Sequence, residues 1–364
     1  MSSKSPYGDL PPESFWRSGV ADVGVFGMQN LWRSPWVLPK DARFSTYGSC
    51  FAQHISRALM SRNLNWFNGE PAPEGMSDET ARRFNFGVFS ARTGNIYTSR
   101  QLLSWVKLAN DPALLDDQEI WADPEGEKGI RYRPVLCPVI EPDGFGSEDE
   151  ARAALACTTK AFLRSITQAD VFVFTLGLTE GWVNRLTGVP YALCPGTIAG
   201  VFDADQHMFH NETYPEIHDQ LSQAFDLMRT MNPDLRILLT VSPVPLTATA
   251  TGGHVLPATM YSKSTLRAVA GDFAQNHAFI DYFPSYEVIA SPPTRGAFFA
   301  PNMRSVEWAG VSVVMGHFFS GLDLSGPARG KKRARTKDAA EIDASLAQED
   351  LVCEEEALER HNGA

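Results

Sequence analysis

The chain has 364 residues, of which 43% are hydrophobic, and a formal net charge of −11 at pH 7. This length and composition allow one large domain or two with a sizeable core, and the negative charge argues against broad binding to nucleic acids. No apolar stretch approaches the roughly 20 residues of a membrane-spanning helix, and the N-terminal residues lack the apolar core of a signal peptide, so we expect a cytoplasmic protein with no membrane span.

The N-terminal region, residues 1–40, is rich in Pro, Gly, Trp and Phe. This composition predicts an irregular arm. Large aromatic side chains favour burial, so we expect the arm to pack on the main domain. The aromatic residues expected to be buried are Phe15, Trp16, Phe26, Trp32 and Trp36.

Residues 41–323 are expected to form the main domain, in which strand and helix patterns alternate. Strand patterns are found at 43–49, 171–177, 236–243 and 278–283. Helical patterns are found at 51–62, 99–109, 147–168, 212–231, 260–276 and 306–320, and residues 181–202 resemble a hairpin-like insertion. The continuous apolar runs among the strand patterns are typical of buried parallel strands. The alternation predicts an α/β fold with a mainly parallel sheet.

The active site of such a sheet lies outside the carboxyl ends of its strands. The segments expected there are Gly48–Cys50, Gly177–Glu180, Ser242–Pro245 and the loop around 295–305. Residues 324–364 differ in composition, with the basic run Lys331–Lys337, the acidic run Glu354–Glu356 and few large apolar residues. We expect a disordered charged tail that acts as a solvated linker.

The five cysteines do not form a CxxC pair, which argues against a zinc site, and their odd number favours reduced thiols. Cys50 differs from the others because it lies where a strand pattern meets a helix pattern. A thiol at a helix N-terminus faces unpaired backbone N–H groups and the positive end of the helix dipole, which favour the thiolate. His54 follows four residues later, on the same helix face, as a candidate base. The alternative is a small buried residue at a tight turn and a half-buried histidine.

The segment Gly48-Ser-Cys-Phe-Ala52 resembles the signature of the GSCFA family. Further segments resemble the same family in the expected order: Asn85–Gly87, Thr175–Glu180, Thr240–Pro245, Tyr261–Lys263 and Phe283–Glu287. The resemblance covers roughly residues 40–320. The GSCFA family itself resembles a divergent branch of the SGNH (GDSL-type) hydrolases. This implies a flavodoxin-like three-layer sandwich with a mainly parallel sheet, and ester chemistry on an acyl group carried by a carbohydrate or lipid.

The SGNH pattern implies roles for several residues of this chain. Its first block, Gly-Asp-Ser, falls on Gly48-Ser49-Cys50, so the resemblance assigns the nucleophile to Cys50. Ser49 is a lesser candidate that could instead cap the helix. The second-block glycine corresponds to Gly87. In the third block, which begins at Gly177, Thr179 occupies the place of the oxyanion-binding Asn.

The fifth block departs from the SGNH pattern. Asn302-Met-Arg-Ser305 stands where Asp-x-x-His is expected. Serine cannot act as a general base near neutral pH, and asparagine cannot stabilise an imidazolium by charge. The standard triad is therefore absent as written. His54 is one replacement for the base, and His254, near the expected site face, is another.

Other polar residues have candidate roles in the site. Glu180 could orient a base or a loop, whereas Lys263 and Arg304 could bind an anionic group of the substrate. For each of them, an ordinary ion pair is the competing interpretation. The spacing of His207 and His210 is compatible with a metal site, but a polar loop is the better interpretation, and we predict no metal and no cofactor.

The sequence therefore predicts a hydrolase or acyltransferase with a cysteine nucleophile. Its substrate would be a small-molecule or glycan acyl ester, with an acyl thioester as a second candidate donor. A different class is a non-catalytic protein that binds a glycan or an acyl carrier in a cleft that has lost its Asp-x-x-His block. A redox-sensing Cys50 is a third hypothesis. The acyl group, the acceptor and the oligomeric state stay open.

Overall fold

The computed structural model describes residues 5–123, 129–326, 355, 358 and 359. Its centre is a parallel sheet, which has five strands within these residues, in the order β11-β10-β6-β2-β3. The strands are β2 (Arg43–Gly48), β3 (Asn65–Trp66), β6 (Val171–Leu176), β10 (Arg236–Val241) and β11 (Ile280–Tyr282). Counted along the chain, this is the 2-1-3-4-5 order of flavodoxin-like doubly wound sheets. The predicted α/β fold with a mainly parallel sheet is confirmed.

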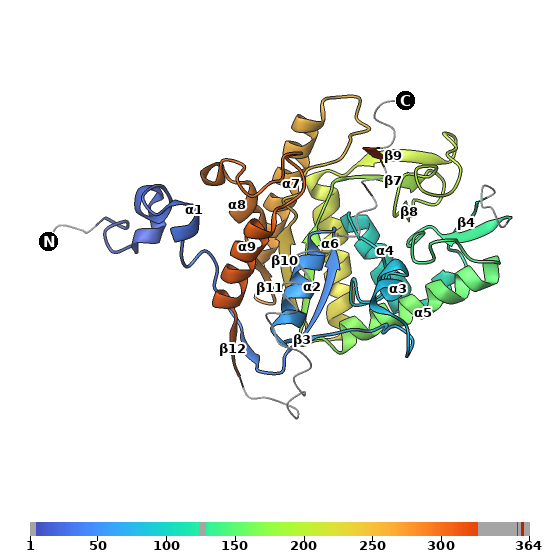
Figure 1. Ribbon diagram of the computed structural model, residues 1–364, viewed down its shortest axis with the longest axis horizontal. Coiled ribbons are helices and arrows are strands. Elements are labelled where there is room, and N and C mark those ends of the chain that lie inside the picture. Colours follow the sequence, from blue (N-terminus) through green and yellow to red (C-terminus); the bar gives the residue numbers. More distant parts are fainter. Residues whose placement is uncertain (1–4, 124–128, 327–354, 356–357, 360–364) are drawn as a thin grey trace.

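Helices cover both faces of the sheet (Figure 1). The helices on one face are α4 (Ser99–Asn110), α5 (Glu148–Thr167), α6 (Tyr214–Met231) and α7 (Val255–Asn276). Those on the other face are α2 (Ala52–Ser61), α8 (Ser285–Ala290) and α9 (Trp308–Gly321). Alternation along β6 shows why both layers form, because successive strand side chains point to opposite faces. Phe172 and Phe174 pack with the first group, and Val171 and Val173 with the second.

Smaller elements surround one end of this sheet. An antiparallel sheet in the order β8-β7-β9 contains β7 (Glu180–Asn184), β8 (Pro190–Tyr191) and β9 (His207–Asn211). The predicted hairpin-like insertion is therefore extended by β9. Strands β4 (Ile120–Asp123) and β5 (Arg131–Pro134) form a hairpin, and α3 (Asp78–Arg83) lies in the loop-rich segment after β3. None of the helices in the described ranges has the length and apolarity that crossing a membrane requires.

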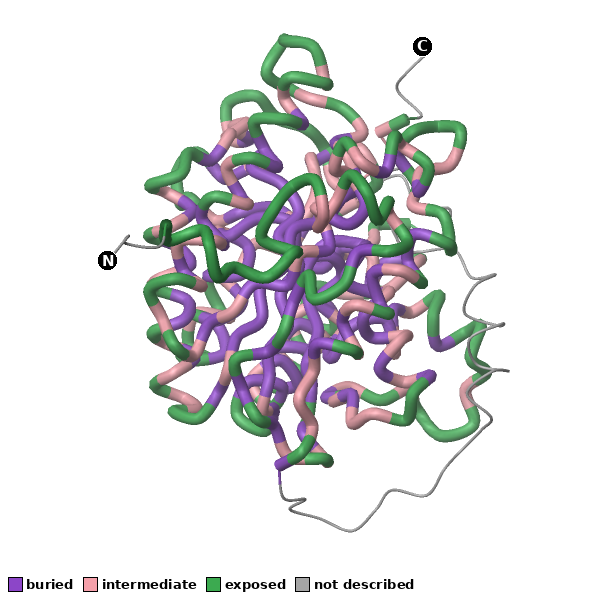
Figure 2. Tube along the Cα trace, turned by 90° about the vertical axis from the view of Figure 1, so that its left-hand side faces the viewer, coloured by how far each residue is buried: buried purple, intermediate pink, exposed green. Residues whose placement is uncertain are grey.

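The N-terminal arm is only partly buried. Trp32 and Trp36 are buried, but Phe15, Trp16 and Phe26 are 41%, 68% and 77% exposed, so the expectation of burial is wrong for these three. Residues 5–27, which include α1 (Gly24–Gly27), lie at the outside of the molecule (Figure 1), where Phe26 packs edge-on against Phe298 with ring centroids 5.8 Å apart but stays largely exposed. Figure 2 shows buried chain concentrated in the centre of the molecule, with exposed chain around it.

The two ends of the main domain meet at a short parallel pairing. Strand β1 (Val37–Pro39) follows the arm and pairs with β12 (Asp323–Gly326). The boundary expected between residues 323 and 324 thus falls inside β12. Residues 327–354 of the expected tail lie outside the described residues. Glu355, Leu358 and Glu359 are described, and the first two lie beside a cavity near the expected site.

Candidate active site

The turn after β2 lies at the point where the strand order of the sheet reverses, between β2 and β6. In open α/β sheets, ligands bind outside the carboxyl ends of the strands at such a switch point. The turn has a tightly determined backbone. Gly48 has φ +128°, and any Cβ there would clash with the carbonyl oxygen of Thr175. The N–H of Ser49 donates to that same oxygen at 3.0 Å. The sheet itself therefore fixes the position of the next residue.

Cys50 lies directly before α2. Its carbonyl oxygen accepts a hydrogen bond from the N–H of Gln53 at 3.1 Å, and Phe51 is the N-cap residue of the helix. The thiol is thus at a helix N-terminus, where the dipole favours a negative charge. The residue is 5% exposed. This is the location that the sequence predicts for a nucleophile.

Ser49 is packed more deeply than Cys50. It is 2% exposed, and its hydroxyl has no hydrogen-bond partner within the described part of the chain. A Cβ at Gly177 would lie 3.0 Å from the Cβ of Ser49, which shows how closely the two turns approach. The alternative of Ser49 as a helix cap is wrong, because Phe51 holds the N-cap position of α2 and no side chain caps it.

Lys263 reaches this turn from α7. It is 1% exposed, and its Nζ donates a hydrogen bond to the carbonyl oxygen of Gly177 at 2.7 Å. Burial lowers the pKa of Lys263 to about 8, while the charges of Glu355 and Cys50 act to raise it and that of Arg304 acts to lower it. A buried ammonium is costly unless it is paired and hydrogen-bonded. Lys263 is therefore in electrostatic contact with the predicted nucleophile.

The turn at residues 302–305 brings in Arg304. The Oδ1 of Asn302 accepts from the N–H groups of Arg304 (3.0 Å) and Ser305 (2.9 Å), and its Nδ2 donates to the Oγ of Ser305 at 3.0 Å. Asn302 and Ser305 are exposed, whereas Arg304 is buried. The Nη2 of Arg304 lies 3.5 Å from the Oε2 of Glu355. The side chain that this turn sends inward is thus the guanidinium of Arg304.

The structure argues against both histidines proposed as the base. Burial, followed by the charge of Arg57, lowers the pKa of His54 to about 3, and Cys50 is not among the causes of this shift. The ring of His54 packs edge-on against Phe51, with ring centroids 5.2 Å apart. His254 is exposed at the N-terminus of α7, where its Nδ1 accepts from the N–H of Leu256 at 3.1 Å. With its pKa this low, His54 is a weak base near neutral pH.

The surroundings of two predicted oxyanion groups bear on that role. Thr179 is fully buried, and its hydroxyl donates to the Oδ1 of Asn211 at 2.7 Å, so its only proton is already used. Gly87 precedes Val88, whose carbonyl oxygen accepts from Ser56 of α2 at 3.3 Å. Gly87 therefore lies beside α2.

The segment that does reach the carboxyl ends is residues 95–97, which the sequence did not single out. The N–H of Ile96 donates to the carbonyl oxygen of Gly48 at 2.9 Å, and the carbonyl oxygen of Tyr97 accepts from Gly177 and Leu178. The segment therefore links the two turns of the site. Nothing in its residue pattern distinguishes it from an ordinary loop.

A cavity of about 180 Å³ adjoins this cluster. Its lining includes Tyr97, Leu178, Trp182, Leu246, Glu180, Cys194, Glu355 and Leu358. The carboxylate of Glu180 accepts from the Oγ1 of Thr249 (2.7 Å) and the N–H of Ala250 (3.2 Å), so it holds the loop that forms one wall. Burial raises the pKa of Cys194 to about 11, which makes this second thiol a poor nucleophile.

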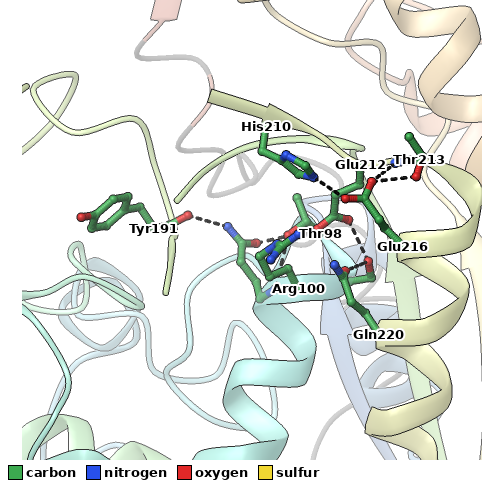
Figure 3. A network of polar contacts seen from close by, with 10 residues as sticks. Thr98, Arg100, Tyr191, His210, Glu212, Thr213, Glu216 and Gln220 are labelled. Atoms are coloured by element: carbon green, nitrogen blue, oxygen red, sulfur yellow. Dashed lines mark hydrogen bonds and ion pairs between the residues drawn. The ribbon is translucent and has the colours of Figure 1, made fainter. Parts of the chain in front are cut away.

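A separate polar network lies behind the cavity (Figure 3). Glu212 accepts from the Oγ of Ser99 at 2.7 Å and lies 3.5 Å from the Nε of Arg100. Burial raises its pKa to about 7, although Ser99 and Arg100 act in the opposite direction. The Nε2 of His210 lies 3.0 Å from the Oε1 of Glu216, which accounts for His210 without a metal.

His207 is also locally bonded. Its Nδ1 accepts from the N–H of Asp203 at 3.0 Å. Among the described residues, no three His, Cys, Asp or Glu side chains are grouped so that they could hold a metal ion. The predicted polar loop is wrong for His207 and His210, because both lie on strand β9, where each has a local hydrogen-bond partner.

Together these features define a doubly wound α/β protein in which a thiol, an ammonium and a guanidinium meet at the switch point of the sheet. The chain matches the model of the GSCFA family over residues 43–318 and therefore belongs to that family.

Two solved structures are similar to the chain at low sequence identity. One is a carbohydrate esterase family 3 enzyme from Talaromyces cellulolyticus, with 10% identity and a TM-score of 0.33, covering 76% of this chain and 94% of that one. The other is an acetyl esterase mutant with an acetate ion, with 9% identity and a TM-score of 0.31, covering 76% and 93%. The comparison with curated proteins found no match.

Proposed function

We propose that this GSCFA protein is an acyl-ester hydrolase or acyltransferase that uses Cys50 as its nucleophile and acts on an acylated carbohydrate or a related ester. The observation that carries the proposal is the position of Cys50. It lies at the switch point of the sheet, at the N-terminus of α2, and its charge acts on buried Lys263. These are the surroundings that activate a thiol for covalent catalysis.

Lys263 takes the role of the base that the sequence assigned to His54. A lysine with a pKa of about 8 is partly deprotonated near neutral pH and can accept the thiol proton. Its hydrogen bond to Gly177 fixes the amine beside the thiol turn. Proton transfer would then need no imidazole, which agrees with the absence of the histidine expected in the fifth block.

The reaction follows in two balanced steps. The sulfur of Cys50 attacks the ester carbonyl while the thiol proton moves to the Nζ of Lys263. The C–O bond then breaks, and Lys263 returns the proton to the leaving alcohol. In the second step, water or a sugar hydroxyl attacks the thioester and gives its proton to Lys263. The C–S bond breaks, and the released thiolate of Cys50 takes the proton back from Lys263. Backbone N–H groups around Cys50, at the positive end of α2, are the proposed donors to the oxyanion.

The test compares Cys50→Ala with the matched control Cys194→Ala on a chromogenic acetyl ester and an acyl thioester. We expect Cys50→Ala to lose turnover by a factor of at least about 10³, and Cys194→Ala to keep it. Unchanged turnover in Cys50→Ala would rule out the mechanism.

A non-catalytic binding protein is the second candidate, and the turn at residues 302–305 favours it. Asn302 and Ser305 are exposed and hydrogen-bonded to each other, so the place of the usual acid–base pair serves the turn itself. This candidate predicts that the wild-type protein binds acylated glycans without releasing acyl groups. Calorimetric titration with an acetylated oligosaccharide, followed by assay of free acetate, distinguishes the two functions.

A further inference from the structure

The C-terminal residues Glu355 and Leu358 lie in the candidate active site, although the rest of the site comes from residues before 305. Both line the cavity beside Tyr97 and Leu246. The described end of the chain can be followed in Figure 1 as the short dark red piece next to β7 and β9. An acidic side chain from the C-terminal part of the chain thus lies at the edge of this cavity.

The contacts of Glu355 are with these cations. Its Oε2 lies 3.5 Å from the Nη2 of Arg304, and the two side chains are only 12% and 10% exposed. Among the charged groups that act on the pKa of Lys263, Glu355 has the largest effect. One carboxylate therefore pairs with Arg304, and its charge also acts on Lys263 at the thiol turn.

This arrangement has a simple electrostatic reason. Two cations that are withdrawn from water need a partner of opposite charge, and removal of one partner leaves an uncompensated charge behind. Arginine in particular favours carboxylates, because its planar donors match their two oxygens. A carboxylate on a bound molecule would offer the cations the same interaction as Glu355.

We propose that Arg304 forms a carboxylate-binding subsite beside Lys263, which Glu355 occupies as an internal ligand while Leu358 lines the neighbouring cavity. The inference rests on the proposed function, in that it assigns this subsite to a substrate that carries a carboxylate near its ester. Such a substrate must displace the carboxylate of Glu355 from Arg304 when it binds.

The experiment measures how fast Cys50 is alkylated by iodoacetate and by iodoacetamide at pH 7. The two reagents have the same reactive carbon, but only iodoacetate carries a carboxylate. Peptide mass spectrometry follows Cys50, and the exposed thiol of Cys157 serves as the reference in the same sample. The full-length wild type is compared with Glu355→Gln and with the control Glu359→Gln, because Glu359 is exposed.

We expect Glu355→Gln to raise the iodoacetate-to-iodoacetamide rate ratio at Cys50 about tenfold, and Glu359→Gln to leave it unchanged. A change in the thiolate fraction of Cys50 alters both rates equally, so the ratio reports how strongly the surroundings of Cys50 attract a carboxylate, and the Arg304 variant tests whether the attraction comes from the subsite. Adding Arg304→Gln to Glu355→Gln should return the ratio to the wild-type value. Melting temperatures check that each variant is folded.

A ratio that is the same in the wild type and Glu355→Gln would overturn the inference. An increase that inorganic phosphate abolishes but acetate does not would also overturn it, because the subsite would then select phosphate. Alkylation requires no turnover, so this result is independent of the test of Cys50→Ala. A raised ratio in a protein without esterase activity would support the subsite and reject the proposed catalysis.

Discussion

The turn after β2 and the turn at residues 302–305 each send one polar side chain into the same buried cluster, but they are held in different ways. The first is fixed by backbone geometry, since Gly48 approaches Thr175 and the N–H of Ser49 bonds to the sheet. The second is fixed by the side chain of Asn302. The comparison teaches that Asn302 stabilises its own turn, whereas the sheet fixes the turn that precedes Cys50. Under the proposed function the base comes from another element, and Lys263 on α7 is the candidate.

The largest expected effect separates Lys263 from His54 as the base. Lys263→Met should lower kcat/KM for a neutral acyl ester by about 10²–10⁴, because it removes the proton acceptor. His54→Ala should stay within about threefold of wild type. Steady-state kinetics at pH 8 measure both variants. A large loss of kcat/KM in His54→Ala with little change in Lys263→Met would identify His54 as the base and contradict the account.

The pH dependence of kcat/KM also distinguishes Lys263 from His54 as the base. A base with the pKa of Lys263, about 8, must lose its proton to act, so kcat/KM should rise up to about pH 8 and level off above it. The charges that act on this lysine are those of Glu355, Cys50 and Arg304. A base with the pKa of His54, about 3, would give a flat profile from pH 5 upward.

The backbone geometry of the turn after β2 can be tested by substitution of Gly48. Gly48→Ala should lower the free energy of unfolding by about 3–5 kcal/mol, because the methyl group meets the Thr175 carbonyl at a positive φ. Gly87→Ala is the matched control. It also has a positive φ (+74°), but nothing lies within 4 Å of its added Cβ, so a cost of about 1 kcal/mol is expected. Urea denaturation measures both, and equal costs would show that the approach to Thr175 does not constrain the turn.

The network behind the cavity should affect stability in a defined pH window. The pKa of Glu212 is raised from 4.5 to about 7 in the folded protein, so between these pH values the folded state keeps a proton that the unfolded state has lost. The contribution of Glu212 to the free energy of unfolding therefore falls as pH rises through this window, by on the order of 3 kcal/mol.

Glu212→Gln should flatten this part of the curve, as measured by urea denaturation between pH 4.5 and 8. Glu359→Gln, at an exposed position, should follow the wild-type curve. A Glu212→Gln curve parallel to wild type would mean that the carboxyl group titrates normally.

The smallest expected effect is that of Asn302→Ala. The substitution removes the hydrogen bonds to Arg304 and Ser305, so the free energy of unfolding should fall by about 1–2 kcal/mol. Its kcat/KM should stay within about threefold of wild type, because the amide takes no part in proton transfer. A loss of about 10³ would show that the second turn is still catalytic.

The sequence predicts the central fold well for a physical reason. Buried parallel strands require continuous apolar runs, and Val171–Leu176 and Arg236–Val241 are found where such runs occur. The position of Cys50 can also be predicted from the local sequence, because the strand end at Gly48 and the start of α2 are close in the chain. Local patterns determine these features, so one sequence is enough to predict them.

The rest of the site depends on contacts between distant segments. Glu355 belongs to an acidic run with the composition of a solvated tail. Only the three-dimensional arrangement shows that Glu355 pairs with Arg304. Helical spacing gives His54 a plausible position relative to Cys50 but does not show that burial suppresses its basicity. Trp16 and Phe26 show the reverse error, because aromatic composition alone suggested burial for side chains that are exposed.

The most direct test of the central claim is to trap the acyl-enzyme. The protein is mixed with an excess of a chromogenic acetyl ester, quenched in acid within the first turnover, and digested for peptide mass spectrometry. The account predicts one acetyl group on the peptide that contains Cys50, and its absence in Cys50→Ala. An acetyl group on Ser49, or ester turnover with an unmodified Cys50, would contradict the account.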